Sequence, residues 1–177
     1  MSRTRVFLSF LSGAVILSAI TPPAFAIEYM TDHIPAAEKV GKGRLTYLFW
    51  DVYDATLYAP QGTWKEDKPF ALELSYLRDI PGKSIADRSI EEIRLQGYSD
   101  EIKLAAWYTQ MRSIFPDVNE GITLTGIFTN SGETIFFKNS KEIGRIQDSE
   151  FSQAFFNIWL SEKTSSPTLR DKLLGSL

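Results

Sequence analysis

The sequence contains no cysteine and only one histidine, His33. The lack of cysteine excludes disulfides, thiolate zinc sites, a cysteine nucleophile and a lipid anchor attached to an N-terminal cysteine. A single histidine argues against a histidine-based catalytic triad or a multi-histidine metal site. No dinucleotide-binding glycine motif, phosphate-binding loop, H-E-x-x-H, G-x-S-x-G or EF-hand pattern is present. We therefore expect no metal and no cofactor.

Excess positive charge is also lacking. The chain carries 19 Lys and Arg against 22 Asp and Glu, a formal net charge of −3. A nucleic-acid binder would show a basic face and a high pI, so we expect no nucleic-acid partner. The 44% hydrophobic content is too high for a disordered chain, and 177 residues suit one domain. No linker or internal repeat interrupts it.

The first 26 residues have the pattern of a signal peptide. Arg3 and Arg5 precede an apolar stretch over residues 6–20, two prolines follow, and Ala24-Phe25-Ala26 has the small-x-small cleavage pattern. The alternative is an uncleaved membrane anchor, but a span needs about 20 apolar residues. We expect residues 27–177 to form an exported domain, periplasmic or extracellular, with no stable membrane span after cleavage.

The first half of this domain has the composition of β-strands. Residues 44–58 are rich in aromatic and β-branched side chains, and we expect a bend or turn near Trp50 and Asp51. Residues 72–76 alternate apolar and polar side chains, which predicts a half-buried strand. Asp51 and Asp54, three apart on a strand, should point to opposite faces and so make a poor metal site.

Helices, a hairpin and further helices follow. We expect a helix from a cap at Ser84 to Gly97 and a second over residues 100–115, which ends before Pro116. A hairpin over residues 122–138 turns at Asn130-Ser131-Gly132-Glu133, and residues 143–146 suit a short third strand. Asp148 begins another helix, and Ser166-Pro167 begins the last. This order predicts an α+β fold, with an antiparallel sheet backed by helices on one face.

Aromatic side chains are the unusual feature, and they gather on the first strands. For any one of them, burial in the core is the simplest interpretation. Together they also suit an apolar ligand cleft between sheet and helices, which a few placed polar groups would complete. Arg44, which begins this segment, could hold an anionic group of a ligand, although a surface position is the simpler interpretation.

The chain resembles the chalcone isomerase family, specifically its exported bacterial branch. The segments that carry the resemblance are VGKGRLTYLFWDVYDATLYAP, LELSYLRDIPGKSIADRSIEE, the Phe115-Pro116 step with the following hairpin, and EFSQAFFNIWL with SSPTLRDKLLG. They span about residues 40–177. The resemblance implies an open-faced sandwich, a large antiparallel sheet backed by helices around a ligand cleft.

The resemblance also implies counterparts of the plant enzymes' active-site residues. The threonine of their first strand corresponds to Tyr53. Their active-site tyrosine, lysine and asparagine correspond to Ile85, Arg88 and Glu92. Loss of the tyrosine hydroxyl at Ile85 removes a hydrogen-bond donor, which argues against the enzymes' cyclisation reaction.

Fatty-acid-binding members of the family hold a carboxylate with an arginine and a tyrosine. The resemblance places Tyr53 in the tyrosine position and Arg44 or Lys42 in the arginine position. It thus implies a non-catalytic protein that binds a small apolar or amphiphilic ligand, such as a fatty acid. The candidate ligand-binding residues are Arg44, Tyr53, Tyr47, Phe49, Trp107 and Met111. The alternatives are an intramolecular lyase and a ligand-free envelope scaffold.

Overall fold

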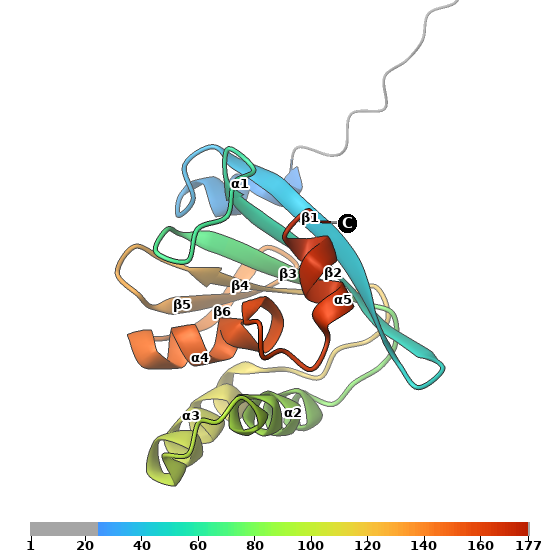
Figure 1. Ribbon diagram of the computed structural model, residues 1–177, viewed down its shortest axis with the longest axis vertical. Helices are drawn as coiled ribbons and strands as arrows, with labels where there is room; N and C mark the ends of the chain where they lie inside the picture. The colour runs from blue at the N-terminus through green and yellow to red at the C-terminus, as the bar shows by residue number, and fades with distance from the viewer. Residues whose placement is uncertain (1–24, 177) are drawn as a thin grey trace, which may run out of the picture.

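The computed structural model describes residues 25–176, and Figure 1 shows their arrangement. Six antiparallel strands form one sheet in the order β1-β2-β3-β4-β5-β6, so that every strand pairs with its neighbour in sequence. The strands are β1 (Ala37–Tyr47), β2 (Trp50–Pro60), β3 (Phe70–Tyr76), β4 (Thr123–Phe128), β5 (Thr134–Lys138) and β6 (Lys141–Ile146). The helices are α1 (Phe25–Thr31), α2 (Gly82–Leu95), α3 (Glu101–Ile114), α4 (Ser149–Leu160) and α5 (Pro167–Leu173). The α+β prediction is confirmed.

Helices α2, α4 and α5 cover one face of the sheet, while α3 packs beside α2 and against β6 (Figure 1). Three of these helices, α3, α4 and α5, begin where the sequence predicts. The Asp100 carboxylate accepts hydrogen bonds from two backbone N–H groups at the start of α3, and Asp148 does the same for α4. The predicted cap at Ser84 is wrong. Helix α2 begins earlier, at Gly82, whose N–H donates to Asp117.

The expectation that helices cover only one face is also wrong. Met30 and Ile34, in and just after α1, are fully buried against the opposite face of the sheet. Their partners include Ile135 and Phe137 of β5, whereas Phe136 between these two faces the main core. Because successive side chains of a strand point to opposite faces of the sheet, the two apolar clusters lie on its two sides.

The turn between β1 and β2 lies at Leu48 and Phe49, just before the predicted position. A β-bulge follows, because Leu45 pairs with Tyr53 but Thr46 pairs with Asp51, which leaves Val52 as the extra residue.

The bulge contradicts the prediction that Asp51 and Asp54 point to opposite faces. The extra residue turns both carboxylates to one side of the hairpin. There Arg44 donates to Asp54 at 2.7 Å and to Asp51 at 2.8 Å.

Two glycines of β1 allow α5 to lie directly on the strand. A Cβ atom at Gly41 would lie 2.1 Å from the backbone oxygen of Lys172, and one at Gly43 would lie 2.7 Å from Leu169. We expect Gly41→Ala to lower the free energy of unfolding by about 1–3 kcal/mol, since helix or strand must shift. Thermal denaturation checks this. The control is Gly97→Ala. No atom lies near a Cβ at this position, so the substitution measures only the cost of its left-handed backbone conformation. An unchanged melting temperature in Gly41→Ala would contradict the close approach.

Candidate functional site

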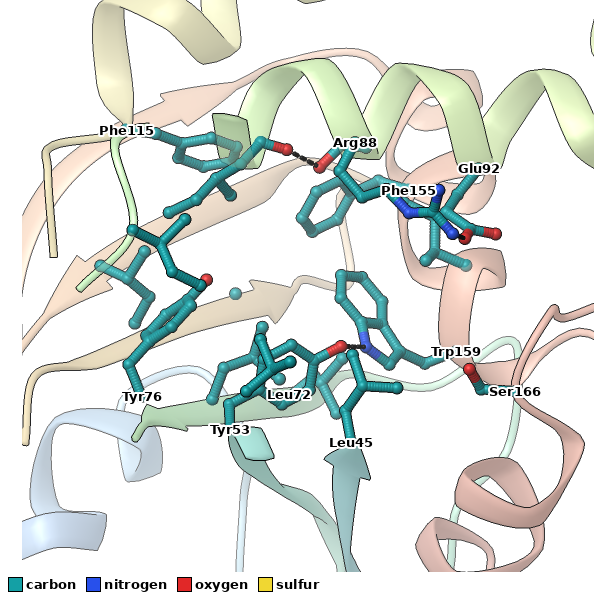
Figure 2. A pocket seen from close by; sticks show the side chains of 18 of the residues that line it. Leu45, Tyr53, Leu72, Tyr76, Arg88, Glu92, Phe115, Phe155, Trp159 and Ser166 are labelled. Atoms are coloured by element: carbon teal, nitrogen blue, oxygen red, sulfur yellow. Dashed lines mark hydrogen bonds and ion pairs between the residues drawn. The ribbon is translucent and has the colours of Figure 1, made fainter. Parts of the chain in front are cut away.

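A cavity of about 620 Å³ lies between the sheet and the helices (Figure 2). Pockets that hold small organic ligands usually measure about 300–1,000 Å³. Most of its wall is apolar and comes from the inward-facing positions of β1 to β5, from α2 and α4, and from the residue that follows α3. These side chains include Leu45, Val52, Leu72, Leu74, Ile85, Phe115, Leu124, Phe136, Phe155, Phe156, Ile158 and Trp159.

Two tyrosine hydroxyls enter this apolar space from neighbouring strands (Figure 2). The Tyr53 hydroxyl accepts a hydrogen bond from Nε1 of Trp159 at 2.9 Å. The Tyr76 hydroxyl points into the cavity. Burial raises the pKa of both side chains well above the ordinary value of tyrosine. Both hydroxyls therefore stay protonated near neutral pH, and each can donate a hydrogen bond.

One arginine and one glutamate from α2 form the charged part of the wall. Arg88 donates to Glu92 one turn later and to Glu91 at 2.8 Å. Partial burial acts to lower the pKa of Arg88, but its hydrogen bonds and the charges of both glutamates outweigh that effect and raise the pKa. The guanidinium is therefore always charged. It has five N–H donors, of which these bonds use only some.

The Glu92 carboxylate is unusual because it is 5% exposed and only partly hydrogen-bonded. Its Oε1 accepts from Arg88 and from the Ser165 hydroxyl at 2.9 Å, while its Oε2 is buried with no partner among the described residues. A buried oxygen without a partner is costly. A ligand that enters here contacts the Arg88 guanidinium and, beside it, a carboxylate with one unpartnered oxygen.

The sequence profile of the chalcone isomerase-like family matches residues 40–175. The chain belongs to this family.

A solved structure supports the family fold. The crystal structure of a fatty-acid binding protein of Arabidopsis thaliana superimposes with a TM-score of 0.61 at 12% sequence identity. The match covers 80% of this chain and 88% of that one. At this identity the likeness shows a shared fold. No curated protein sequence matches the chain significantly.

The counterparts that the family resemblance implies do meet in one place. Tyr53, Ile85, Arg88 and Glu92 all line the cavity. Arg88 and Glu92 were predicted only as counterparts of enzyme residues and not as ligand-binding residues. Tyr76 and Trp159 were not predicted as ligand-binding residues either. Alternation along residues 72–76 was the signal for Tyr76, because it places this side chain on the same face as Leu72 and Leu74.

The other candidate residues lie at the edge of the cavity or away from it. Tyr47 lines its rim, and Phe49 is at the exposed turn. Trp107 and Met111 of α3 are buried in the core and are not among the residues that line the cavity. Trp107 donates to Asp148 at 2.9 Å.

Arg44 and Lys42 lie on the face of β1 that points away from the cavity. Arg44 is held by Asp51 and Asp54, and Lys42 lies 3.5 Å from Asp54. Position 44 alternates with Gly43 and Leu45, which face the helices and the cavity, so its side chain points outward.

No helix within residues 25–176 is long and apolar enough to cross a membrane. No group of three acidic or histidine side chains in that range could hold a metal ion.

Proposed function

We propose that this protein binds one amphiphilic molecule, such as a fatty acid, with its apolar chain in the cavity and its carboxylate at Arg88. The observation that carries the proposal is a large apolar cavity whose wall, among the residues that the structure describes, contains a single cationic side chain, Arg88. Tyr53 and Tyr76 supply hydroxyl donors deeper in the same space. The fatty-acid binding protein of the same fold supports this ligand class.

The binding role is non-catalytic. Ring closure of the chalcone isomerase type needs donors that stabilise the developing charge. Ile85 offers none at the position where the plant enzymes carry a tyrosine.

The second part of the proposal is that the protein is exported before it binds its ligand. It is supported by the signal-peptide pattern of residues 1–26, most of which lies outside the described residues. Cleavage after Ala26 would shorten α1, which begins at Phe25. Tyr29, Met30 and Ile34 would remain to cover the second face of the sheet. N-terminal sequencing of the exported protein should therefore start at Ile27.

The ligand is tested by extraction. The purified protein is treated with organic solvent, and the released molecules are identified by mass spectrometry. We expect about one fatty acid or similar amphiphile per chain. The delipidated protein should rebind one equivalent of palmitate. An empty extract together with no palmitate binding would contradict the proposal and favour a ligand-free scaffold.

An intramolecular lyase is the second candidate, favoured by the two tyrosine hydroxyls that reach the cavity. The test is chalcone cyclisation followed by absorbance. Turnover above the spontaneous rate that is lost in Tyr53→Phe would replace the binding proposal with an enzyme. We expect no turnover.

A further inference from the structure

The turn between β1 and β2 carries four consecutive apolar side chains, Tyr47-Leu48-Phe49-Trp50. They are 61%, 73%, 95% and 62% exposed, respectively. The hairpin projects beyond the helices at one end of the molecule (Figure 1). Soluble proteins rarely expose so much contiguous apolar surface without a partner for it. We call these four residues the hairpin tip.

Leu48 is a poor choice for the backbone of this turn. Leu48 has a φ of 55°, in the left-handed region, where a residue with a branched side chain is strained. Two-residue hairpin turns favour glycine or asparagine at such a position. A sequence that departs from local preference at an exposed place often does so for function. Stability of the turn therefore does not explain Leu48.

The composition and charge of the hairpin tip suit the surface of a lipid bilayer. Tyrosine and tryptophan concentrate at membrane interfaces, where the ring is buried and its polar atom meets the headgroups. The guanidinium of Arg78 lies 5.0 Å from the ring centre of Trp50 and makes no ion pair with any residue of the described range. An arginine beside the aromatic rings is placed to meet a lipid phosphate. The nearby charges of Arg44 are already balanced by two aspartates.

The hairpin tip is continuous with the cavity. Tyr47 belongs to the tip and lines the cavity rim, and the preceding Leu45 and Thr46 line its wall. A bilayer that holds the tip would lie directly beside the entrance for an amphiphile.

From these observations we propose that the hairpin tip inserts into the interface of a phospholipid bilayer and docks the cavity entrance on the membrane. The driving force is burial of aromatic and aliphatic side chains, so zwitterionic lipid suffices. Bilayer binding does not depend on which ligand the cavity holds, so it can fail or succeed independently of the proposed function.

The test is co-sedimentation of the purified protein with sucrose-loaded phosphatidylcholine vesicles. The informative variant is Leu48→Gly with Phe49→Ser, because it suits the turn and should keep or raise the melting temperature. We expect vesicle binding to fall at least about tenfold, since each apolar side chain contributes substantially. The matched control is Ile102→Ser, which removes another exposed apolar side chain, 85% exposed. It belongs to α3, a helix that lies away from the β1–β2 hairpin (Figure 1). This variant should bind as the unmodified protein does.

Three results would overturn the proposal. The first is no binding of the unmodified protein to the vesicles. The second is equal binding by the double variant. The third is a dimer that dissociates in the double variant, which would assign the tip to an interface with a second copy of the chain.

Discussion

Replacing Arg88 with alanine should weaken palmitate binding by about ten- to a hundredfold. A hydrogen bond to a charged group contributes about 1.5–3 kcal/mol, and each 1.4 kcal/mol is a factor of ten. The substitution also leaves the charge of Glu92, which is only 5% exposed, without its main partner in the cavity wall. Both effects disfavour a carboxylate. Isothermal titration of the delipidated protein measures the change.

Arg44→Ala is the matched control. It removes the arginine that the sequence alone favours for the ligand carboxylate, but its ion pairs are with Asp51 and Asp54 outside the cavity. Palmitate affinity should be unchanged. A loss in Arg44→Ala with none in Arg88→Ala would reverse the assignment of the carboxylate site.

Glu92→Gln should change palmitate affinity in the opposite direction. The neutral amide removes repulsion of the ligand carboxylate and releases Arg88 from its ion pair, so binding should tighten several-fold. The double substitution Arg88→Gln with Glu92→Gln leaves no buried charge unpaired and guards against misfolding. It should still bind weakly. Tighter binding in the double variant, or weaker binding in Glu92→Gln alone, would contradict a carboxylate held at Arg88.

Trp107→Ala should cause the largest loss of stability. Trp107 is 1% exposed, and its ring packs against Tyr98 and Phe151 at centroid distances of 4.8 and 5.7 Å. Truncation of a buried aromatic side chain costs about 3–5 kcal/mol. In a protein of this size the melting temperature should fall by about 6–20 °C.

The control for Trp107 is Ile102→Ala, an exposed position on the same helix. It should leave the melting temperature nearly unchanged. Palmitate affinity of folded Trp107→Ala, measured well below its melting temperature, should equal that of the unmodified protein. Weaker palmitate binding without loss of stability would instead indicate that Trp107 contacts the ligand, as its aromatic side chain suggests.

Local sequence patterns predicted much of the fold. The alternation in β3 and the Asp100 and Asp148 caps of α3 and α4 follow from neighbouring residues alone. The bulge at Val52 and the packing of α1 do not, because they depend on contacts between segments distant in sequence. The start of α2 depends in the same way on Asp117, which lies 35 residues from Gly82.

The choice of cation in the candidate site shows the same limit. Tyr53 was predicted as a ligand-binding residue and does line the cavity. Arg44, with Lys42 as the alternative, was predicted as the cation because it is near Tyr53 along the chain. Which side of β1 carries its side chain is fixed by the register with β2 and by the packing of α5 on Gly43. Neither this register nor this packing can be predicted from residue types alone. The family resemblance did indicate Arg88, but as the counterpart of an enzyme residue.

A crystal structure of the delipidated protein after palmitate is added tests carboxylate binding at Arg88 most directly. We predict one acyl chain in the cavity between Tyr76 and Phe155, with its carboxylate within hydrogen-bond distance of the Arg88 guanidinium. An empty cavity at saturating palmitate, or a carboxylate bound at Arg44 on the outer side of the hairpin, would contradict it.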